Sequence, residues 1–107
     1  MSLVIVGYIL VFIVGVCVAN GIPHYIKGVT GQSHMTVFNK VSSSTVNVLW
    51  GLFNWFLAFI LYALFNSFID NFTGIHMIVA IIGGVLISLR LAKLWSDPDA
   101  KLPWHKY

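Results

Sequence analysis

Three long apolar runs constrain this chain more than any other feature of its sequence. They cover about residues 3–19, 46–65 and 75–94 and are nearly free of charged side chains. A helix rises about 1.5 Å per residue, so segments of this length match a hydrocarbon core of about 30 Å. Because that core holds no water, a spanning segment must satisfy its own backbone hydrogen bonds, as a helix does. We therefore expect an all-α integral membrane protein with three transmembrane helices in a small bundle.

The composition excludes several other classes of protein. Of the 107 residues, 59% are hydrophobic and 8% are charged, whereas a soluble globular domain carries about 25% charged residues. A single cysteine excludes a disulfide scaffold, and six scattered basic residues do not make a nucleic-acid-binding module. We expect one membrane domain, residues 1–107, whose partners are the lipid bilayer and itself or another membrane protein, with no nucleic acid.

The segments between the runs are rich in residues that begin or end helices. Hydroxyl and amide side chains before the second and third runs can cap their first turns. After the first run, Asn20-Gly21 and Pro23 indicate a stop or a kink. The first helix therefore either ends at Asn20-Gly21 or continues as a short kinked segment at the membrane interface. The expected connections are a loop over residues 20–45, a short loop over 66–74 and a tail over 95–107.

The basic residues indicate the orientation of the chain in the membrane. All six Lys and Arg residues lie in the 20–45 loop or at and after Arg90, and the 66–74 loop carries none. Loops rich in Lys and Arg stay in the cytoplasm. We therefore expect the N-terminus and the 66–74 loop outside, and the 20–45 loop and the 95–107 tail in the cytoplasm.

Each run also carries small residues at helical spacing. Such spacing places them on one face of a helix, where they let a second helix approach closely. The expected packing residues are Gly7, Gly15, Gly51, Ala58, Ala80, Gly84 and Ser88.

Four polar residues form the candidate functional cluster: Asn20, His24, Asn47 and Asn54. Asn47 and Asn54 lie on the packing face of the second helix. Their amides are interpreted either as structural links between helices or as the lining of a small ligand-binding cavity open to the cytoplasm. His24 is interpreted either as a residue at the mouth of that cavity or, in its more ordinary role, as an interfacial side chain bonded to a carbonyl.

The patterns of catalytic and metal sites are missing from the sequence. No carboxylate lies within a run, which argues against the proton relay of a secondary transporter. No histidine has a second histidine, cysteine or carboxylate three or four residues away, so no helical metal pair exists. A nucleophile paired with a base, or a phosphate-binding glycine loop, cannot be assembled. We therefore expect no enzymatic activity, no catalytic residue, no cofactor and no metal.

Two stretches of the sequence resemble a family of small uncharacterised bacterial inner-membrane proteins that carry the motif N-G-[IV]-P-H-[FY]. The first stretch is Asn20-Gly21-Ile22-Pro23-His24-Tyr25, followed by Gly28 and Gly31, and the second is Asn47-Val48-Leu49-Trp50-Gly51, followed by Asn54. Together they cover less than a third of the chain. The resemblance implies a location in the bacterial inner (cytoplasmic) membrane and no established activity. It also implies that the four residues of the polar cluster form one unit.

These observations leave three hypotheses about function. The leading one is a small polytopic membrane protein that acts through helix–helix association, as a homo-oligomer or as a subunit of a larger complex. The alternative is a small-solute or ion pathway formed by an oligomer, with His24, Asn47 and Asn54 at its cytoplasmic mouth. The third is holin-like permeabilisation of the membrane, because three helices with an outer N-terminus and a basic tail resemble the layout of one class of phage holins.

Overall fold

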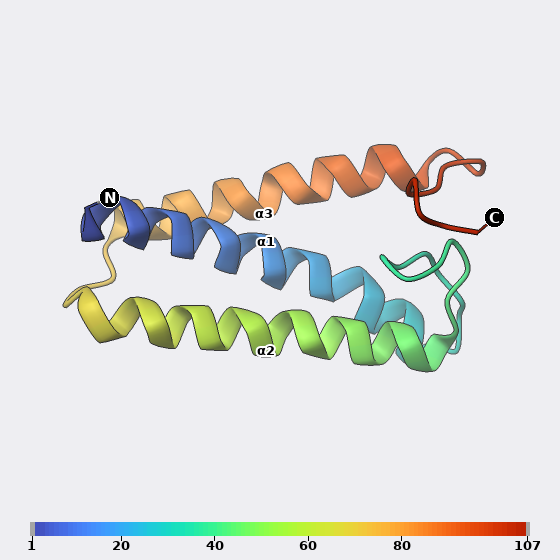
Figure 1. The fold of residues 1–107 in the computed structure, drawn as a ribbon, viewed down its shortest axis with the longest axis horizontal. Helices are drawn as coiled ribbons and strands as arrows, with labels where there is room; N and C mark the ends of the chain where they lie inside the picture. Colours follow the sequence, from blue (N-terminus) through green and yellow to red (C-terminus); the bar gives the residue numbers. More distant parts are fainter. Residues whose placement is uncertain (1, 107) are drawn as a thin grey trace.

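Three long helices make up most of the computed structural model, which describes residues 2–106 (Figure 1). Helix α1 extends over Leu3–Val29, α2 over Ser44–Phe68 and α3 over Gly74–Trp95. Each helix is long and apolar enough to cross a membrane. The chain is therefore an all-α, multi-pass membrane protein, as the three apolar runs predict.

A hydroxyl side chain caps the start of each helix. Ser2 accepts a hydrogen bond from an amide in the first turn of α1 at 3.3 Å, and Ser43 does the same for α2 at 3.2 Å. At α3, the Thr73 hydroxyl accepts from the His76 amide, and the His76 ring accepts in return from the Thr73 amide at 3.0 Å. These bonds satisfy backbone donors that have no partner within the helix, so the sequence signals for helix starts are accurate.

Helix α1 does not stop where the sequence indicates a break. Of the two expected outcomes for the first helix, continuation past Pro23 is the one observed: residues 20–29 belong to α1. Because α2 begins at Ser44, the connecting loop covers residues 30–43 and not the expected 20–45. Pro23 lacks an N–H, so it removes a hydrogen bond from the ladder, a loss that helices packed against other helices tolerate. Gly21 and Gly28 bring this half of α1 against the backbone of α2, and that contact supports the helical conformation.

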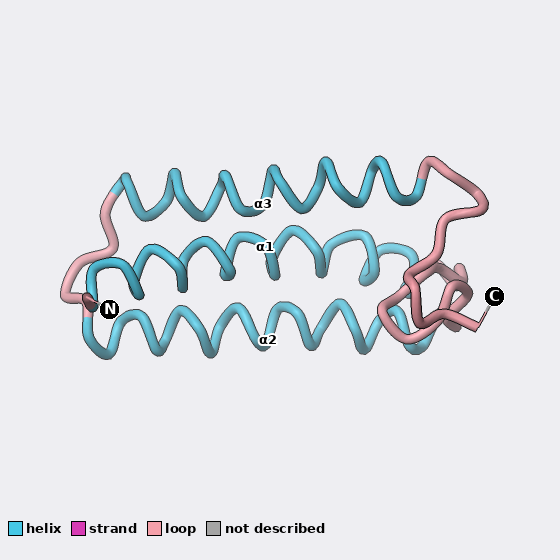
Figure 2. Tube along the Cα trace, turned by 45° about the horizontal axis from the view of Figure 1, so that its top comes forward, coloured by secondary structure: helices cyan, strands magenta, loops and turns pink. Residues whose placement is uncertain are grey.

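Helix α1 lies between the other two helices (Figure 1, Figure 2). It packs along both α2 and α3, which lie on opposite sides of it. Side chains of α2 and α3 meet near the 69–73 connection, where the rings of Phe65 and His76 are 4.9 Å apart. The body is elongated, 44 × 23 × 22 Å, with the 30–43 loop and the 96–106 tail at the end opposite the N-terminus.

The buried apolar core is small and lies between the N-terminal half of α1 and the C-terminal part of α2. Val11 and Phe65 are completely buried and Leu10 nearly so. Many other large apolar side chains on the helices are exposed, such as Phe56 and Leu89. An apolar surface of this extent implies contact with a lipid bilayer.

Candidate functional site: a polar cluster beneath a cap

The four candidate polar residues lie along the contact between α1 and α2, where they form two hydrogen-bonded pairs. Asn20 donates from Nδ2 to Oδ1 of Asn54 at 3.1 Å, and Asn54 donates in turn to the Trp50 carbonyl of its own helix at 2.9 Å. One turn further along α1, His24 Nδ1 lies 2.8 Å from Oδ1 of Asn47. The structure thus brings all four residues to one contact. The later residue of α1 pairs with the earlier residue of α2, as expected for two antiparallel helices.

Asn47 has the most hydrogen-bond partners of the cluster, and none of its surface is exposed (0%). Its Nδ2 donates to the backbone carbonyls of His34, Ser42 and Ser43 at 3.0, 3.2 and 3.0 Å. This orientation turns Oδ1 towards His24, and an amide oxygen can only accept. His24 Nδ1 therefore carries the hydrogen and donates it, which leaves Nε2 as the acceptor of the neutral ring.

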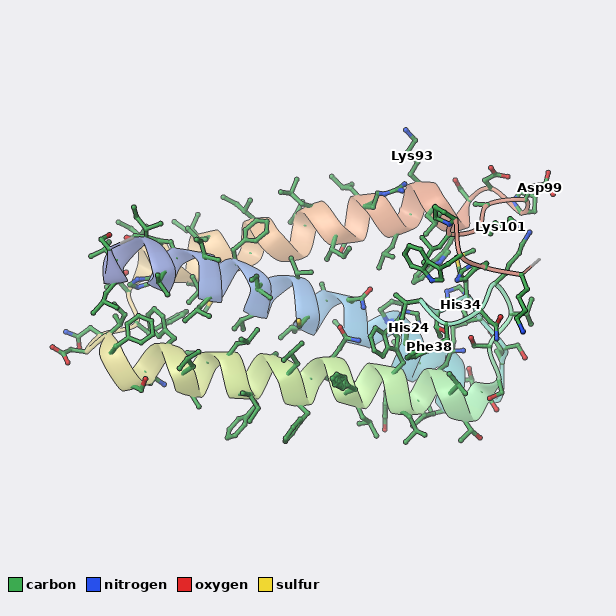
Figure 3. The ribbon with its side chains drawn as sticks, in the orientation of Figure 1. His24, His34, Phe38, Lys93, Asp99 and Lys101 are labelled. Carbon is green, nitrogen blue, oxygen red and sulfur yellow. The ribbon has the colours of Figure 1, made fainter. Side chains whose placement is uncertain are left out.

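His24 does not lie at a water-accessible interface. Only 3% of its surface is exposed. Its ring lies 5.4 Å from that of Trp95 and 5.9 Å from that of His34 (Figure 3). Its ring is bonded to an amide oxygen and lines a small cavity, but it is not exposed to water as an ordinary interfacial side chain would be, because α1 continues past Pro23 and the 30–43 loop folds back over the ring.

The 30–43 loop and the 96–106 tail cover this end of the helices, and we call them together the cap. Within the loop, His34 and Ser42 pair through two backbone hydrogen bonds of 3.0 Å. The hydroxyls of Thr36 and Ser42 are 2.7 Å apart, and both residues are buried. The loop is therefore a compact turn that Asn47 anchors to the start of α2.

The tail is docked onto the loop by two ring N–H groups. The Leu102 amide donates to Nδ1 of His105, so Nε2 of this ring carries the hydrogen and donates to the Thr36 carbonyl at 2.8 Å. The neighbouring indole of Trp104 donates to the Val37 carbonyl. Sequence analysis did not identify these residues, because they contact each other across 69 and 67 positions and no periodic pattern connects them.

His34 is the least satisfied residue of the cap. Its Nε2 is buried and has no hydrogen-bond partner within residues 2–106, and its ring lies 4.2 Å from that of Trp95. Burial, and after it the neighbouring His24 and Lys27, lower the pKa of His34 below its ordinary value of 6.5. The ring is therefore neutral in the folded chain at neutral pH.

A small cavity lies between the cluster and the cap. Its volume is about 60 Å³, and Asn20, His24, Trp50 and Trp95 are among the residues that line it. Because a water molecule occupies about 30 Å³ in the liquid, the cavity holds about two. In the part of the chain from 2 to 106, no group of three His, Cys, Asp or Glu side chains is placed to hold a metal ion. The site can join helices and anchor the cap, but its cavity is too small for a pathway through one chain.

The contact between α1 and α3 depends on glycines. A Cβ atom on Gly15 would overlap the carbonyl oxygen of Ala80, and one on Gly83 would overlap that of Phe12. Gly84 lies beside Gly15, and a Cβ atom on it would make a tight contact of 3.3 Å with the Gly15 carbonyl oxygen. Gly15, Ala80 and Gly84 are thus at the expected contact, and Gly83 is a further packing residue that the sequence analysis missed.

The contact between α1 and α2 has a similar close approach. A Cβ atom on Gly21 or Gly51 would lie within 2.9 Å of the other residue's carbonyl oxygen, and Gly28 packs against α2 in the same way. Gly7 faces a side chain rather than a backbone, with 3.3 Å of clearance for a Cβ atom, and Ala58 is buried on α2. Gly21 and Gly28 belong to the motif of the first stretch, but the spacing of small residues did not identify them.

Ser88 is the expected packing residue that contributes least to the helix contacts. Its side chain is exposed, and its hydroxyl donates to the Gly84 carbonyl of its own helix at 2.7 Å. It lies at the edge of the α1–α3 contact beside Ala19 and Ile22.

Comparisons with protein-family models, with curated proteins and with solved structures find no match for this chain. Its function must therefore be argued from its own geometry. That geometry is a hydrogen-bonded contact between two helices, closed by a docked cap, with a third helix packed on the opposite side.

Proposed function

We propose that the protein acts in the membrane through helix–helix association. The surface that receives the partner is a groove between α1 and α3, and the partner is a transmembrane helix of a second copy or of another membrane protein. One observation carries this proposal: the floor of the groove consists of four small residues that remain partly accessible, Gly15, Ala19, Ala80 and Gly84. A floor of small residues lets the backbone of an incoming helix approach closely, which is how helices associate in lipid.

The walls of the groove suit an apolar partner. They include Val18 and Ile22 on α1, which are 44% and 45% exposed, and Ile81 on α3, which is 55% exposed. The other close-packing glycines of the helices are already covered within the chain, as the Gly21–Gly51 contact is. The groove is therefore the small-residue surface that is left for a further helix.

Photocrosslinking in the native membrane tests this surface for either kind of partner. A photoreactive amino acid at Ile81 lies on the wall of the groove, whereas one at Ile82 lies on the same helix outside it. Both isoleucines are exposed, so they are a matched pair. We expect a crosslink to a protein, either a second copy or another membrane protein, from position 81 and only lipid adducts from position 82. Lipid adducts alone at both positions would contradict the proposal.

The pathway and holin-like hypotheses are less well supported. The amides of Asn20, Asn47 and Asn54 are hydrogen-bonded within the chain, so they are not free to line an aqueous path. Liposomes that contain the protein should therefore show neither selective solute uptake nor abrupt dye release. Uptake would favour the pathway, and dye release would favour permeabilisation.

The proposal includes a non-catalytic role, the bacterial inner membrane and an outer N-terminus. All six basic residues lie in the half of the molecule that carries the cap, which supports a cytoplasmic cap. A cytoplasm-active reporter fused after the last residue should give a signal, and a periplasm-active reporter at the same place should not. The opposite result would reverse the orientation.

A further inference from the structure

The cap lies at the depth of the lipid headgroups. Helix α3 has 22 residues and rises about 33 Å, close to the hydrocarbon core of about 30 Å. Its last residue, Trp95, therefore marks one boundary of that core, and His24 of α1 lies at the same level, with the two rings 5.4 Å apart. The cap extends beyond this level, together with the last turn of α1 and the first turn of α2, while Phe38 of the loop folds back to lie beside His24 (Figure 3).

A groove on the outside of α2 begins at the cap. Its volume is about 660 Å³, and it is lined by Phe38, Asn39, Val41, Ser42, Ser43, Val46, Leu49, Trp50 and Phe53. Phe38, which is 58% exposed, forms the cap side of the groove with its ring edge-on to Trp50 at 5.2 Å. Leu49, 61% exposed, forms the helix side. Both walls leave large apolar side chains uncovered by the chain itself.

The groove changes from polar to apolar along the membrane normal. The end at the cap carries Asn39 and the serines at the start of α2, whereas the other end carries Leu49 and Phe53. About 15 Å of helix separates Ser43 from Phe53. The apolar end is continuous with the exposed face of α2, on which Phe56 follows. This gradient matches a molecule with a polar headgroup and an acyl chain, placed at the depth where the bilayer itself changes from polar to apolar.

The charge at this end favours an anionic headgroup. All six basic side chains and two of the three acidic ones lie in the half that carries the cap. Lys40, the basic residue of the loop, follows Asn39 of the groove in the chain and itself lines a neighbouring pocket with His34 and Asp97. Basic residues at the headgroup layer attract anionic lipids.

We propose that this groove is a binding site for one anionic phospholipid, with its acyl chain along Leu49 and Phe53 and its glycerol phosphate at the Asn39 end. The site fixes the cap against the headgroup layer. It shares no lining residue with the groove between α1 and α3, so this proposal does not depend on the proposed function.

Native mass spectrometry of the full chain tests the site. The protein is released from nanodiscs that contain equal amounts of phosphatidylglycerol and phosphatidylethanolamine, and we expect one phosphatidylglycerol to stay bound in preference. The double variant Phe38→Ala/Leu49→Ala removes one apolar side chain from each wall and should retain about fivefold less lipid. The control Phe59→Ala/Leu64→Ala removes the same two residue types from exposed positions on α2 further from the cap and outside the groove, and should retain lipid like the wild type.

A second pair of variants tests the headgroup. Lys40→Gln should lower the retention of phosphatidylglycerol about fivefold, while Lys93→Gln, which removes an exposed lysine that points away from α2, should not (Figure 3). Three results would overturn the proposal: no retained lipid on the wild type, equal retention of the two lipids, or equal loss from both double variants. A dimer mass that disappears in Phe38→Ala/Leu49→Ala would overturn it as well, because a second copy would then occupy the groove.

Discussion

The two contacts of α1 are built differently. Towards α2, α1 uses hydrogen bonds between side chains as well as glycines: Asn20 with Asn54, His24 with Asn47, and the Trp55 indole with a carbonyl of α1 at 3.1 Å. Towards α3, no side-chain hydrogen bond joins the two helices within residues 2–106. That contact consists of close approach at glycines and of two ring contacts, Tyr8 with His76 at 4.8 Å and His24 with Trp95 at 5.4 Å.

The two kinds of contact differ in how strictly they fix the register of the paired helices. Glycines bring two backbones together, and dispersion then stabilises the pair in any register that keeps the small residues facing each other. A hydrogen bond between amides fixes one register, because an unpaired amide in hydrocarbon is unfavourable. Helices α1 and α2 therefore form the fixed half of the molecule, and α3 is the helix whose attachment depends on shape alone.

The largest effect is expected from breaking the shape-dependent contact. Gly15→Ala places a methyl group on the Ala80 carbonyl, which should cost about 3 kcal/mol, the upper end for overpacking. Spin labels should show α3 moving away from α1 while the α1–α2 distance stays constant. Gly74→Ala is the control, because a Cβ atom there meets nothing within 4 Å. If α1 and α2 also separate, the two contacts are not independent.

The next largest loss of stability is expected from breaking the hydrogen-bonded contact between α1 and α2. We expect replacement of Asn47 to destabilise the protein more than replacement of Asn54. Asn47→Leu leaves the buried N–H of His24 without its acceptor and removes one of the two donors to each of the carbonyls of His34 and Ser42. This change should cost about 2 kcal/mol. Asn54→Leu removes a bond to one side chain within the membrane, which should cost about 0.6 kcal/mol. The free energy of unfolding in detergent measures both variants. If Asn54→Leu is the more destabilising variant, the His24–Asn47 pair is not the main connection between α1 and α2.

A smaller and local effect is expected at the tail. His105→Ala removes the N–H that donates to the Thr36 carbonyl, a loss of about 1 kcal/mol. Limited proteolysis should then cut the 96–106 tail faster, while the helices resist as in the wild type. Trp104→Phe, which keeps the ring but removes the indole N–H, should act in the same direction. Unchanged cleavage in both variants would show that the tail is held by other contacts.

The smallest effect is expected from pH. Burial lowers the pKa of His34 in the folded chain, whereas the unfolded chain keeps the ordinary value of 6.5. Between these two pKa values the unfolded chain binds more protons than the folded chain. The stability is therefore fully present above pH 6.5, and it is lost as the pH falls through the pKa of the folded chain. Tryptophan fluorescence should report loosening of the cap on acidification from about pH 7.5 to about pH 5. His34→Gln should flatten this response, and an unaltered response in that variant would assign it to another group.

The sequence also predicts a large part of the site, but not its arrangement. The motif resemblance implies that Asn20, His24, Asn47 and Asn54 form one unit, and the expected topology allows it because all four lie near the same end of the helices. It does not predict that Asn20 pairs with Asn54 and His24 with Asn47. That choice depends on the rotation of each helix about its axis, which many distant contacts decide together.

Sequence alone determined the three membrane helices, the caps of the second and third, and the position of the basic end. These features depend on the length of an apolar run and on backbone hydrogen bonds within a few residues, which are local properties. Only the tertiary structure decided that α1 continues through Pro23, since the glycine contact with α2 supports the helix there. It also decided that the cap buries His24, through bonds such as His105 to Thr36 that join residues 69 positions apart. Bonds of that kind exist only once the helices have brought both segments to one end of the molecule.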